Sequence, residues 1–261
     1  MNNLFDIACN FSSERFDKDL NEVIQRAKNN NVNKFLVVSA SLNDTEKINR
    51  IYEDNKDSCF FTIGVHPHNA KEFISSSSIK MKSLIDTYKP NSVGETGLDF
   101  FRNISSYEEQ IFAFEEQIKI AIDKDLPLFL HQREAHDDFI KILSKYKDSI
   151  SKAVVHCFTG TQKELDDYLD IGCHIGLTGW ICDANRNIDL RKSLINIPLD
   201  KLMIETDCPY LIPKNLEEKP KNNRNEPAFL PHIAKEISTL MNVDINQLVK
   251  KTYENSINFF S

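Results

Sequence analysis

Four short apolar stretches of the chain each end in a side chain that can bind a metal ion, and these side chains are Glu95, His131, His156 and Asp207. Imidazole nitrogens combined with carboxylate oxygens are suitable ligands for Zn²⁺ or Mn²⁺ and, less ideally, for Mg²⁺. A single histidine at the end of a strand is more often a hydrogen-bonded structural residue. Four independent coincidences of this kind are a poor explanation, so the pattern predicts a metal site. Two divalent ions about 3.5–4 Å apart, bridged by a carboxylate, are a common arrangement for hydrolysing a phosphodiester.

Further polar groups surround these four residues. Glu95 lies between Gly94 and Gly97, which have no Cβ and let the backbone come close to whatever Glu95 holds. Side chains two residues apart in a strand share a face. Three pairs should therefore face the same side of the sheet: His66 with His68, His131 with Arg133, and Glu205 with Asp207.

The elements that must position these residues alternate between strand and helix. Eight strands alternating with helices in about 250 residues predict an α/β protein with a (β/α)8 TIM barrel and a site at the carboxyl ends of its strands. A miscount of one unit would favour an open, doubly wound sheet instead. Without a long linker or a second composition regime, residues 1–261 are expected to form one domain. The strands are expected over residues 4–10, 35–40, 59–65, 173–178 and 202–207, around Glu95, and before His131 and His156. The main helical patterns cover residues 17–29, 107–124, 163–170, 228–241 and 245–259, with another opening at residue 43.

Composition limits the class of protein. A hydrophobic share of 41% and a charged share of 27% are ordinary for a soluble globular protein. No apolar run approaches the ~20 residues that span a bilayer, and the first apolar segment contains Asp6 and lacks a basic region before it. The six cysteines include no Cys-x-x-Cys pair, so we expect reduced thiols in a cytoplasmic protein. A net charge of −7 argues against a broad basic surface for duplex DNA, although a bound cation and a few arginines can reverse the field inside one cleft.

Several of these stretches together resemble one family. The segment 94–99, Gly-Glu-Thr-Gly-Leu-Asp, resembles the Gly-Glu-x-Gly-Leu-Asp motif of TatD-type metal-dependent deoxyribonucleases, and 130–135 is similar to their Leu-His-x-Arg-x-Ala motif. The resemblance covers essentially the whole chain, because the remaining motifs follow in the family's order. These are residues 64–68, 155–160, 204–211 and 224–227.

The resemblance implies a TIM barrel of the amidohydrolase-like group, a cytoplasmic location and a nuclease activity supported by Mg²⁺. It also implies that Glu95, His131, His156 and Asp207 are metal ligands. Glu95 would bridge where two ions bind, and Asp207 would orient or deprotonate the attacking water. His66, His68, Glu205, Arg133 and Asn10 would support the site or contact substrate.

One departure from the family pattern concerns the first strand. Most members begin with Asp-x-His-x-His, whereas this chain has Asp6-Ile7-Ala8-Cys9-Asn10. That replacement resembles the branch typified by TatD itself, a 3′→5′ exonuclease on single-stranded DNA and RNA with a role in DNA repair or degradation. Without the two imidazoles, we expect one or two ions, a weaker second ion, and a preference for Mg²⁺ over Zn²⁺, with Mn²⁺ or Zn²⁺ as the alternatives.

The expected substrate is therefore a single-stranded DNA or RNA end, bound by a monomer that needs no protein partner or membrane. Aromatic side chains after the strand ends could stack on bases or could pack the loops. They are Phe100, Phe101, Trp180 and Tyr210. Among Arg102, Arg133, Arg186 and Arg224, which could contact phosphates, Arg133 is the best candidate.

Two other functions stay open at this point. A small-molecule amidohydrolase, such as a lactonase or deaminase, could use the same barrel, because fold does not fix function. Against it, the His-x-His pair of such enzymes is absent and no lysine ends a strand. A non-catalytic protein with a vestigial metal site is disfavoured by the intact set Glu95, His131, His156 and Asp207.

Overall fold

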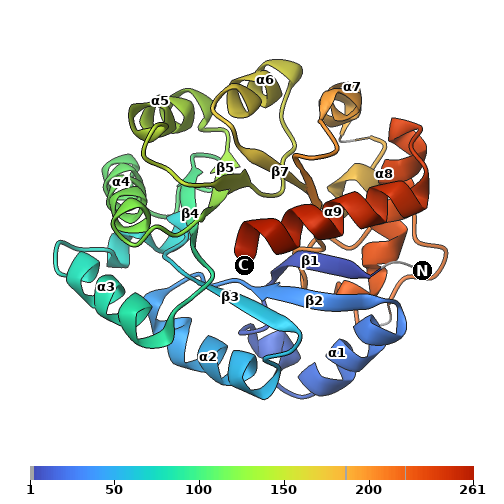
Figure 1. Ribbon diagram of the computed structural model, residues 1–261, viewed down its shortest axis with the longest axis horizontal. Helices are drawn as coiled ribbons and strands as arrows, with labels where there is room; N and C mark the ends of the chain where they lie inside the picture. The colour runs from blue at the N-terminus through green and yellow to red at the C-terminus, as the bar shows by residue number, and fades with distance from the viewer. Residues whose placement is uncertain (1–2, 186, 221) are drawn as a thin grey trace.

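Eight parallel strands form one sheet in sequence order, and helices surround it (Figure 1). The computed structural model describes residues 3–185, 187–220 and 222–261. Every consecutive pair of strands is parallel, which confirms the predicted (β/α)8 TIM barrel. The strands are β1 Leu4–Cys9, β2 Val32–Val37, β3 Cys59–Ile63, β4 Ser92–Asp99, β5 Leu128–Arg133, β6 Ala153–Val155, β7 His174–Leu177 and β8 Leu202–Ile204.

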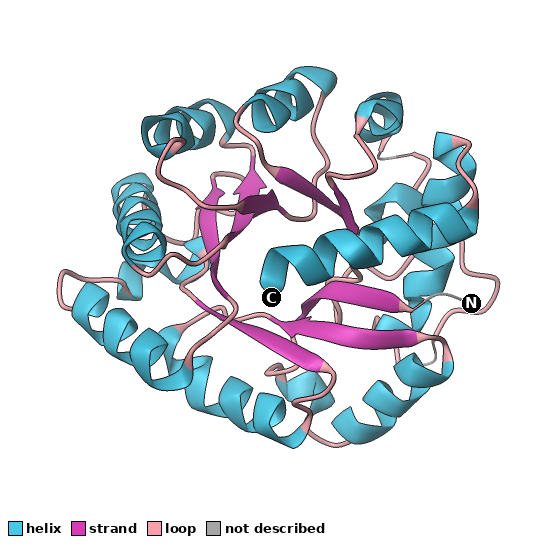
Figure 2. Cartoon of the chain, viewed as in Figure 1, coloured by secondary structure: helices cyan, strands magenta, loops and turns pink. Residues whose placement is uncertain are grey.

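The helices surround the strands, except that α9 (Ile245–Phe260) lies across one end of the barrel (Figure 2). They are α1 Leu20–Asn29, α2 Thr45–Asp54, α3 Ser77–Tyr88, α4 Tyr107–Asp123, α5 His136–Tyr146, α6 Gln162–Asp170, α7 Ile188–Ser193, α8 Leu230–Met241 and α9 Ile245–Phe260. No helix in the described part of the chain is long and apolar enough to cross a membrane.

The barrel is nearly closed between its first and last strands. Cys9 forms an isolated parallel β-bridge with Cys208. The backbone amide of Asn10 donates to the Cys208 carbonyl at 2.9 Å. The ends of β1 and β8 therefore lie side by side at the mouth, where each strand is followed by polar residues.

Apolar side chains fill both the barrel interior and the layer between strands and helices. The interior cluster includes Phe5, Leu36, Phe129 and Met203. The last turn of α9 covers one end of this cluster, where Phe260 contacts Phe5 with ring centroids 5.9 Å apart. In Figure 1 the C-terminus accordingly lies near the centre of the ring of strands. Because Phe5 is near the start of β1, α9 closes the amino end and leaves the carboxyl end free.

Helix α4 fixes the ends of two strands through buried glutamines. The Gln117 side chain accepts from the Val65 amide at 2.7 Å and donates to the Val65 carbonyl at 3.0 Å, just before His66. Gln110 accepts from the Asp99 amide at 2.8 Å and donates to its carbonyl at 3.2 Å. Side-chain amides thus satisfy backbone groups where the ladder stops, and they hold the polar residues of β3 and β4 in place.

The predicted strands agree with the structure, although several of their ends differ by a few residues; β4 and β5, for example, continue past Glu95 and His131 to Asp99 and Arg133. Strand β2 begins at Val32, three residues before the expected start at Phe35. Strand β8 ends at Ile204, so Glu205 and Asp207 follow the strand and do not belong to it. Asp207 has φ +55°, a left-handed conformation, so the alternation of a strand no longer applies there. The expectation that both carboxylates simply share one strand face is therefore wrong.

Candidate active site

Three histidine side chains approach the same carboxylate oxygen at the mouth of the barrel. Oε1 of Glu95 lies 2.8 Å from Nε2 of His156, 2.9 Å from Nδ1 of His131 and 3.2 Å from Nε2 of His66. Glu95 and His131 lie within β4 and β5, whereas His66 and His156 follow the ends of β3 and β6. Glu95 is only 6% exposed. The predicted residues of four neighbouring strands therefore do converge on one buried point.

The glycines beside Glu95 permit this convergence by allowing close backbone approach. A Cβ on Gly94 would lie 2.4 Å from the Phe129 carbonyl oxygen, and one on Gly97 would lie 1.9 Å from that of His131. Both glycines also have positive φ, +152° and +146°, which side-chain-bearing residues rarely adopt. Strand β4 can therefore run close to β5, and Glu95 reaches His131 directly.

A second carboxylate, Asp99, lies beside this cluster. Its Oδ2 is 2.7 Å from Nε2 of His68 and 3.4 Å from Nε2 of His131, while its Oδ1 accepts from the Arg102 amide at 2.8 Å. The expected pairing of His66 with His68 is present, with ring centroids 4.3 Å apart, but each imidazole faces a different carboxylate. Asp99 was not singled out as a site residue from the sequence. Its position four residues after Glu95, on the same strand face, is the signal that could have identified it.

Glu205 and Asp207 complete the mouth from the end of β8. Glu205 is fully buried, and its Oε1 accepts from the Cys157 amide at 2.6 Å and lies 3.5 Å from Nδ1 of His156. Asp207 is half-buried, and its Oδ1 accepts from Nδ2 of Asn10 at 2.9 Å. Asn10 therefore contacts Asp207 through its amide nitrogen, as a donor. Ala8, the other position of the departure from the family pattern, is buried among the interior apolar side chains.

The buried carboxylate of Asp6 holds the segment between Glu205 and Asp207. Its Oδ1 accepts from the Thr206 amide at 2.9 Å and its Oδ2 from the Thr206 hydroxyl at 2.5 Å. The Thr206 carbonyl in turn accepts from the Asn225 side chain at 2.9 Å. Asp6 and Asn225 therefore position both carboxylates of β8. Asp6 was missed as a supporting residue, because nothing in a local stretch indicates that β1 and β8 meet.

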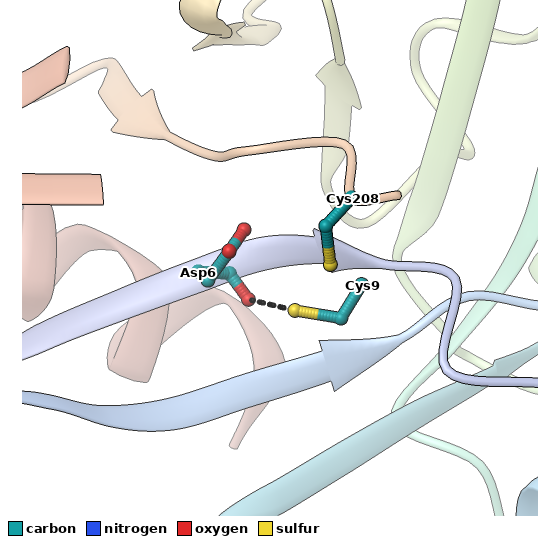
Figure 3. A group of neighbouring side chains, drawn as sticks. All are labelled: Asp6, Cys9 and Cys208. Carbon is teal, nitrogen blue, oxygen red and sulfur yellow. Dashed lines mark hydrogen bonds between the residues drawn. The ribbon is translucent and has the colours of Figure 1, made fainter. Parts of the chain in front are cut away.

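Two cysteines lie near Asp6 without forming a second plausible metal site. Ligand atoms of Asp6, Cys9 and Cys208 lie within 4.8 Å of one another, and all three residues are buried. Figure 3 shows the group, with the Cys9 thiol donating to the Asp6 carbonyl at 3.9 Å. Burial raises the pKa of both thiols, and Thr206 already occupies both carboxylate oxygens of Asp6. We interpret this group as packing between β1 and β8.

The predicted arginines differ in their surroundings. Arg133 stacks on the ring of Phe101, with its guanidinium carbon 3.9 Å from the ring centroid. Arg224 is buried and binds Asp19 at 2.6 Å and Glu226 at 2.7 Å, so it is a structural ion-pair residue. Arg102 is exposed, and Arg186 lies outside the described residues.

Burial and neighbouring charges set the protonation of the cluster. Burial would raise the pKa of Glu95, but His156 and His66 hold it well below its usual range. Burial lowers the pKa of His66 to about 4, so this imidazole is neutral at pH 7. Since its Nδ1 accepts from the His68 amide at 3.1 Å, the proton of neutral His66 is on Nε2, facing Glu95. Burial raises the pKa of Asp207 to about 7, and the nearby Glu95 carboxylate adds to this effect.

Comparison with known proteins identifies the family. The sequence pattern of the family described as "TatD related DNase" matches residues 5–261. A relative from Yersinia pseudotuberculosis, named 3′-5′ ssDNA/RNA exonuclease TatD, is 42% identical over 257 residues, which is 98% of this chain and 99% of the relative. A relative of the same name from Erwinia tasmaniensis is 40% identical over 258 residues, 99% of this chain and all of the relative. The chain belongs to the TatD-related DNase family.

Solved structures agree with this membership. The crystal structure of a TatD-family hydrolase from Entamoeba histolytica has a TM-score of 0.89 at 29% identity, covering 100% of this chain and 99% of that one. A TatD homologue from Escherichia coli has a TM-score of 0.90 at 24% identity, covering 98% and 97%, and supports the fold alone.

The donor set of this TatD-family chain fits a divalent cation. Ligand atoms of His66, Glu95 and His131 lie within 4.8 Å of one another and could hold an ion. Among the described residues, Nε2 of His131, Nδ1 of His156 and Oε2 of Glu205 are buried without a hydrogen-bond partner. Buried polar atoms are rarely left unpaired, and an ion with its water shell would satisfy such atoms.

From the pKa shifts at the mouth of the barrel, we predict that the metal-free protein loses stability as pH rises from about 6 to about 8.5. Burial raises the pKa of Asp6 and Asp207 to about 7, so the folded chain holds protons there that the unfolded chain has already released. Losing them costs about 1.4 kcal/mol each over this range, and His66, whose pKa burial lowers to about 4, offsets about 0.8 kcal/mol because only the unfolded chain is protonated there near pH 6. Burial opposes the charged forms of His131 and His156, but the neighbouring Asp99 and Glu95 carboxylates raise the pKa values of both imidazoles. Their stabilising positive charge is therefore also lost as the pH rises. The pKa of Glu95 is lowered, so its contribution to the free energy of unfolding stays constant above about pH 5.

Thermal melts of chelator-treated protein at the two pH values measure this effect. We expect a melting temperature roughly 5 °C or more lower at the higher pH, and a larger rise on adding Mg²⁺ or Mn²⁺ there, because cations compete with protons for these groups. Equal melting temperatures would contradict the assigned protonation.

Proposed function

We propose that this chain is a metal-dependent nuclease that removes nucleotides from the 3′ end of single-stranded DNA and RNA. The relatives at about 40% identity carry the name of that activity over their full length. The observation that supports the proposal most directly is the approach of three imidazoles to one oxygen of Glu95, with Asp207 after β8 at the same mouth of the barrel. A role in DNA repair or DNA degradation would follow from this activity.

We assign the cation to Glu95, His131, His156 and Asp207, with His66 as a further donor. When bound, a divalent cation would polarise a phosphoryl oxygen and lower the pKa of a bound water. Its charge would also favour the carboxylate form of Asp207, which could then orient the attacking water and take its proton. Asn10 holds Asp207 from one side, and the Asp6 contacts with Thr206 hold the backbone before it.

In this proposal, other residues position the metal ligands or contact the substrate. His68 and Asp99 hold His131 from the side away from Glu95, and Glu205 holds the backbone after His156. Arg133 is proposed to meet a substrate phosphate, since its contact with Phe101 uses the face of the guanidinium and the N–H donors lie in the guanidinium plane, along its edge. The chain is proposed to act as a monomer, because all these groups come from one barrel, and to be cytoplasmic, because its six cysteines are free thiols.

A small-molecule amidohydrolase on the same barrel has less support. The fold alone does not distinguish the two activities. The full-length relatives at about 40% identity carry the name of a nuclease, and the first strand offers Ala8 and Asn10 where such enzymes have two histidines. A panel of lactones and amides assayed beside oligonucleotides separates the alternatives.

Substrate form tests the exonuclease proposal. A net charge of −7 and few arginines at the mouth suit a single frayed end better than a duplex. We expect linear single strands to be degraded at least about tenfold faster than blunt duplex, since unpairing an end costs a few kcal/mol. Circular single strands should resist. Rapid cleavage of a closed circle would show an endonuclease.

Substitutions in and after β1 test which ion the site prefers. An imidazole at position 10 would add a nitrogen donor beside Asp207, and nitrogen donors favour Zn²⁺ over Mg²⁺. We therefore expect Ala8→His with Asn10→His to bind Zn²⁺ at least about tenfold more tightly than the wild type, which requires only about 1.4 kcal/mol from the added nitrogen donors. Calorimetric titration of chelator-treated protein measures it. Because Ala8 is buried, Asn10→His alone is the variant least disturbing to the fold, and unchanged Zn²⁺ affinity in both variants would mean that this strand does not face the ion.

A further inference from the structure

A hollow of about 370 Å³ lies beside the cluster, between the loops that follow β7, β8 and β1. Two aromatic side chains line it, Trp180 after β7 and Tyr210 after β8. Cationic side chains line it as well, Arg15, Lys214 and Lys219, together with one carboxylate, Asp183. The hollow is therefore aromatic and mainly basic in a chain whose net charge is −7.

The hollow adjoins the proposed site directly. The Tyr210 amide donates to the Asp207 carbonyl at 2.9 Å, which closes a turn and keeps the two Cα atoms within about 7 Å. Nη1 of Arg15 donates to the Pro209 carbonyl inside that turn at 3.1 Å. A ligand in the hollow would therefore lie next to whatever Asp207 contacts.

The lining suits one nucleotide. Tyr210 is 53% exposed, so its ring is not used in packing, and Trp180 is half-buried. Aromatic faces stack on unpaired bases of any sequence, and lysines attract phosphates. The volume is at the lower end of small-molecule sites, which is the size of a single nucleotide. Loops after the seventh and eighth strands of TIM barrels also frequently bind phosphate.

We propose that this hollow binds the nucleotide next to the scissile phosphate, with its base against Trp180 and Tyr210 and its phosphate toward Lys214 and Lys219. The inference rests on the proposed nuclease function and gives it a substrate contact. A site that accepts one unpaired base also supplies a physical reason for single-strand preference. Phe101, on the other side of the mouth, is already covered by Arg133.

Binding can be measured without catalysis, because Trp180 is the single tryptophan of the chain. Deoxyadenosine monophosphate is titrated into chelator-treated protein while tryptophan emission is recorded. We expect saturable quenching, and a Kd raised roughly 5- to 100-fold by Tyr210→Ala. Phe112→Ala, an exposed aromatic on α4, is the matched control and should leave Kd unchanged. Absence of quenching, or an unchanged Kd in Tyr210→Ala, overturns the proposal.

Turnover of modified strands supplies the second measurement. Oligonucleotides carry an abasic residue on either side of the terminal scissile phosphate. We expect wild type to slow at least about fivefold at one of the two positions, and Tyr210→Ala to treat abasic and intact strands alike. Lys214→Ala with Lys219→Ala should reduce the salt dependence of strand binding, whereas Lys250→Ala with Lys251→Ala on α9 should not.

Different results would refute the proposed nuclease function and the proposed nucleotide-binding hollow. A chain that binds the nucleotide at Trp180 but hydrolyses no strand would refute the proposed function and leave the binding site. A chain that hydrolyses abasic and intact strands equally, at both positions, would refute the binding site and leave the function.

Discussion

Glu95→Gln is expected to lower the rate of single-strand hydrolysis by about 10³-fold or more while the barrel stays folded. Glutamine keeps the shape of the side chain but removes the charge that three imidazoles face. An ion held mainly by neutral donors would bind weakly, so both metal affinity and turnover should fall.

The measurement combines turnover, circular dichroism and calorimetric binding of Mg²⁺ and Mn²⁺. Glu46→Gln, an exposed carboxylate on α2, is the matched control and should behave as the wild type. A folded Glu95→Gln enzyme with near wild-type turnover would mean that the cluster around Glu95 does not hold the ion.

Asp207→Asn is the second change with a large expected effect, a fall of about 10³-fold in kcat. Asparagine can keep the contact with Asn10 through its oxygen, so the fold and strand affinity should change little. It cannot take a proton from water, and it offers a cation no charge. The loss should therefore appear in kcat, with a KM for the strand within about threefold of the wild type.

A pH profile and the matched variant Asp189→Asn complete this test. Asp189 is an exposed carboxylate on α7, away from the mouth, and its substitution should be silent. If Asp207→Asn raised KM and left kcat intact, Asp207 would be a substrate-binding group and its proposed role with water would be wrong.

The sequence predicted the barrel and the convergence at Glu95 because both depend on local patterns. Apolar runs that end in Glu95, His131 and His156 identify strands and their mouth, and helix-length spacing identifies a parallel sheet. Gly94 and Gly97 were correctly interpreted as points of close backbone approach.

The remaining features depend on contacts between distant parts of the chain. Asp6 supports the site only because β1 and β8 close the barrel, and Arg224 is buried only because Asp19 lies beside it. The direction of Asp207 depends on a left-handed backbone that strand alternation does not predict. The hollow at Trp180 and Tyr210 requires three loops from different strands.

The most direct test of the metal-dependent 3′→5′ exonuclease is a ladder experiment with chelator-stripped enzyme. A single-stranded oligonucleotide of about 20 residues, labelled at its 5′ end, is incubated with and without Mg²⁺, and the products are separated by length. The proposal predicts no cleavage without added ion and, with Mg²⁺, products that shorten one nucleotide at a time from the 3′ end. Full activity of stripped enzyme, or immediate release of the 5′-labelled nucleotide, would contradict it.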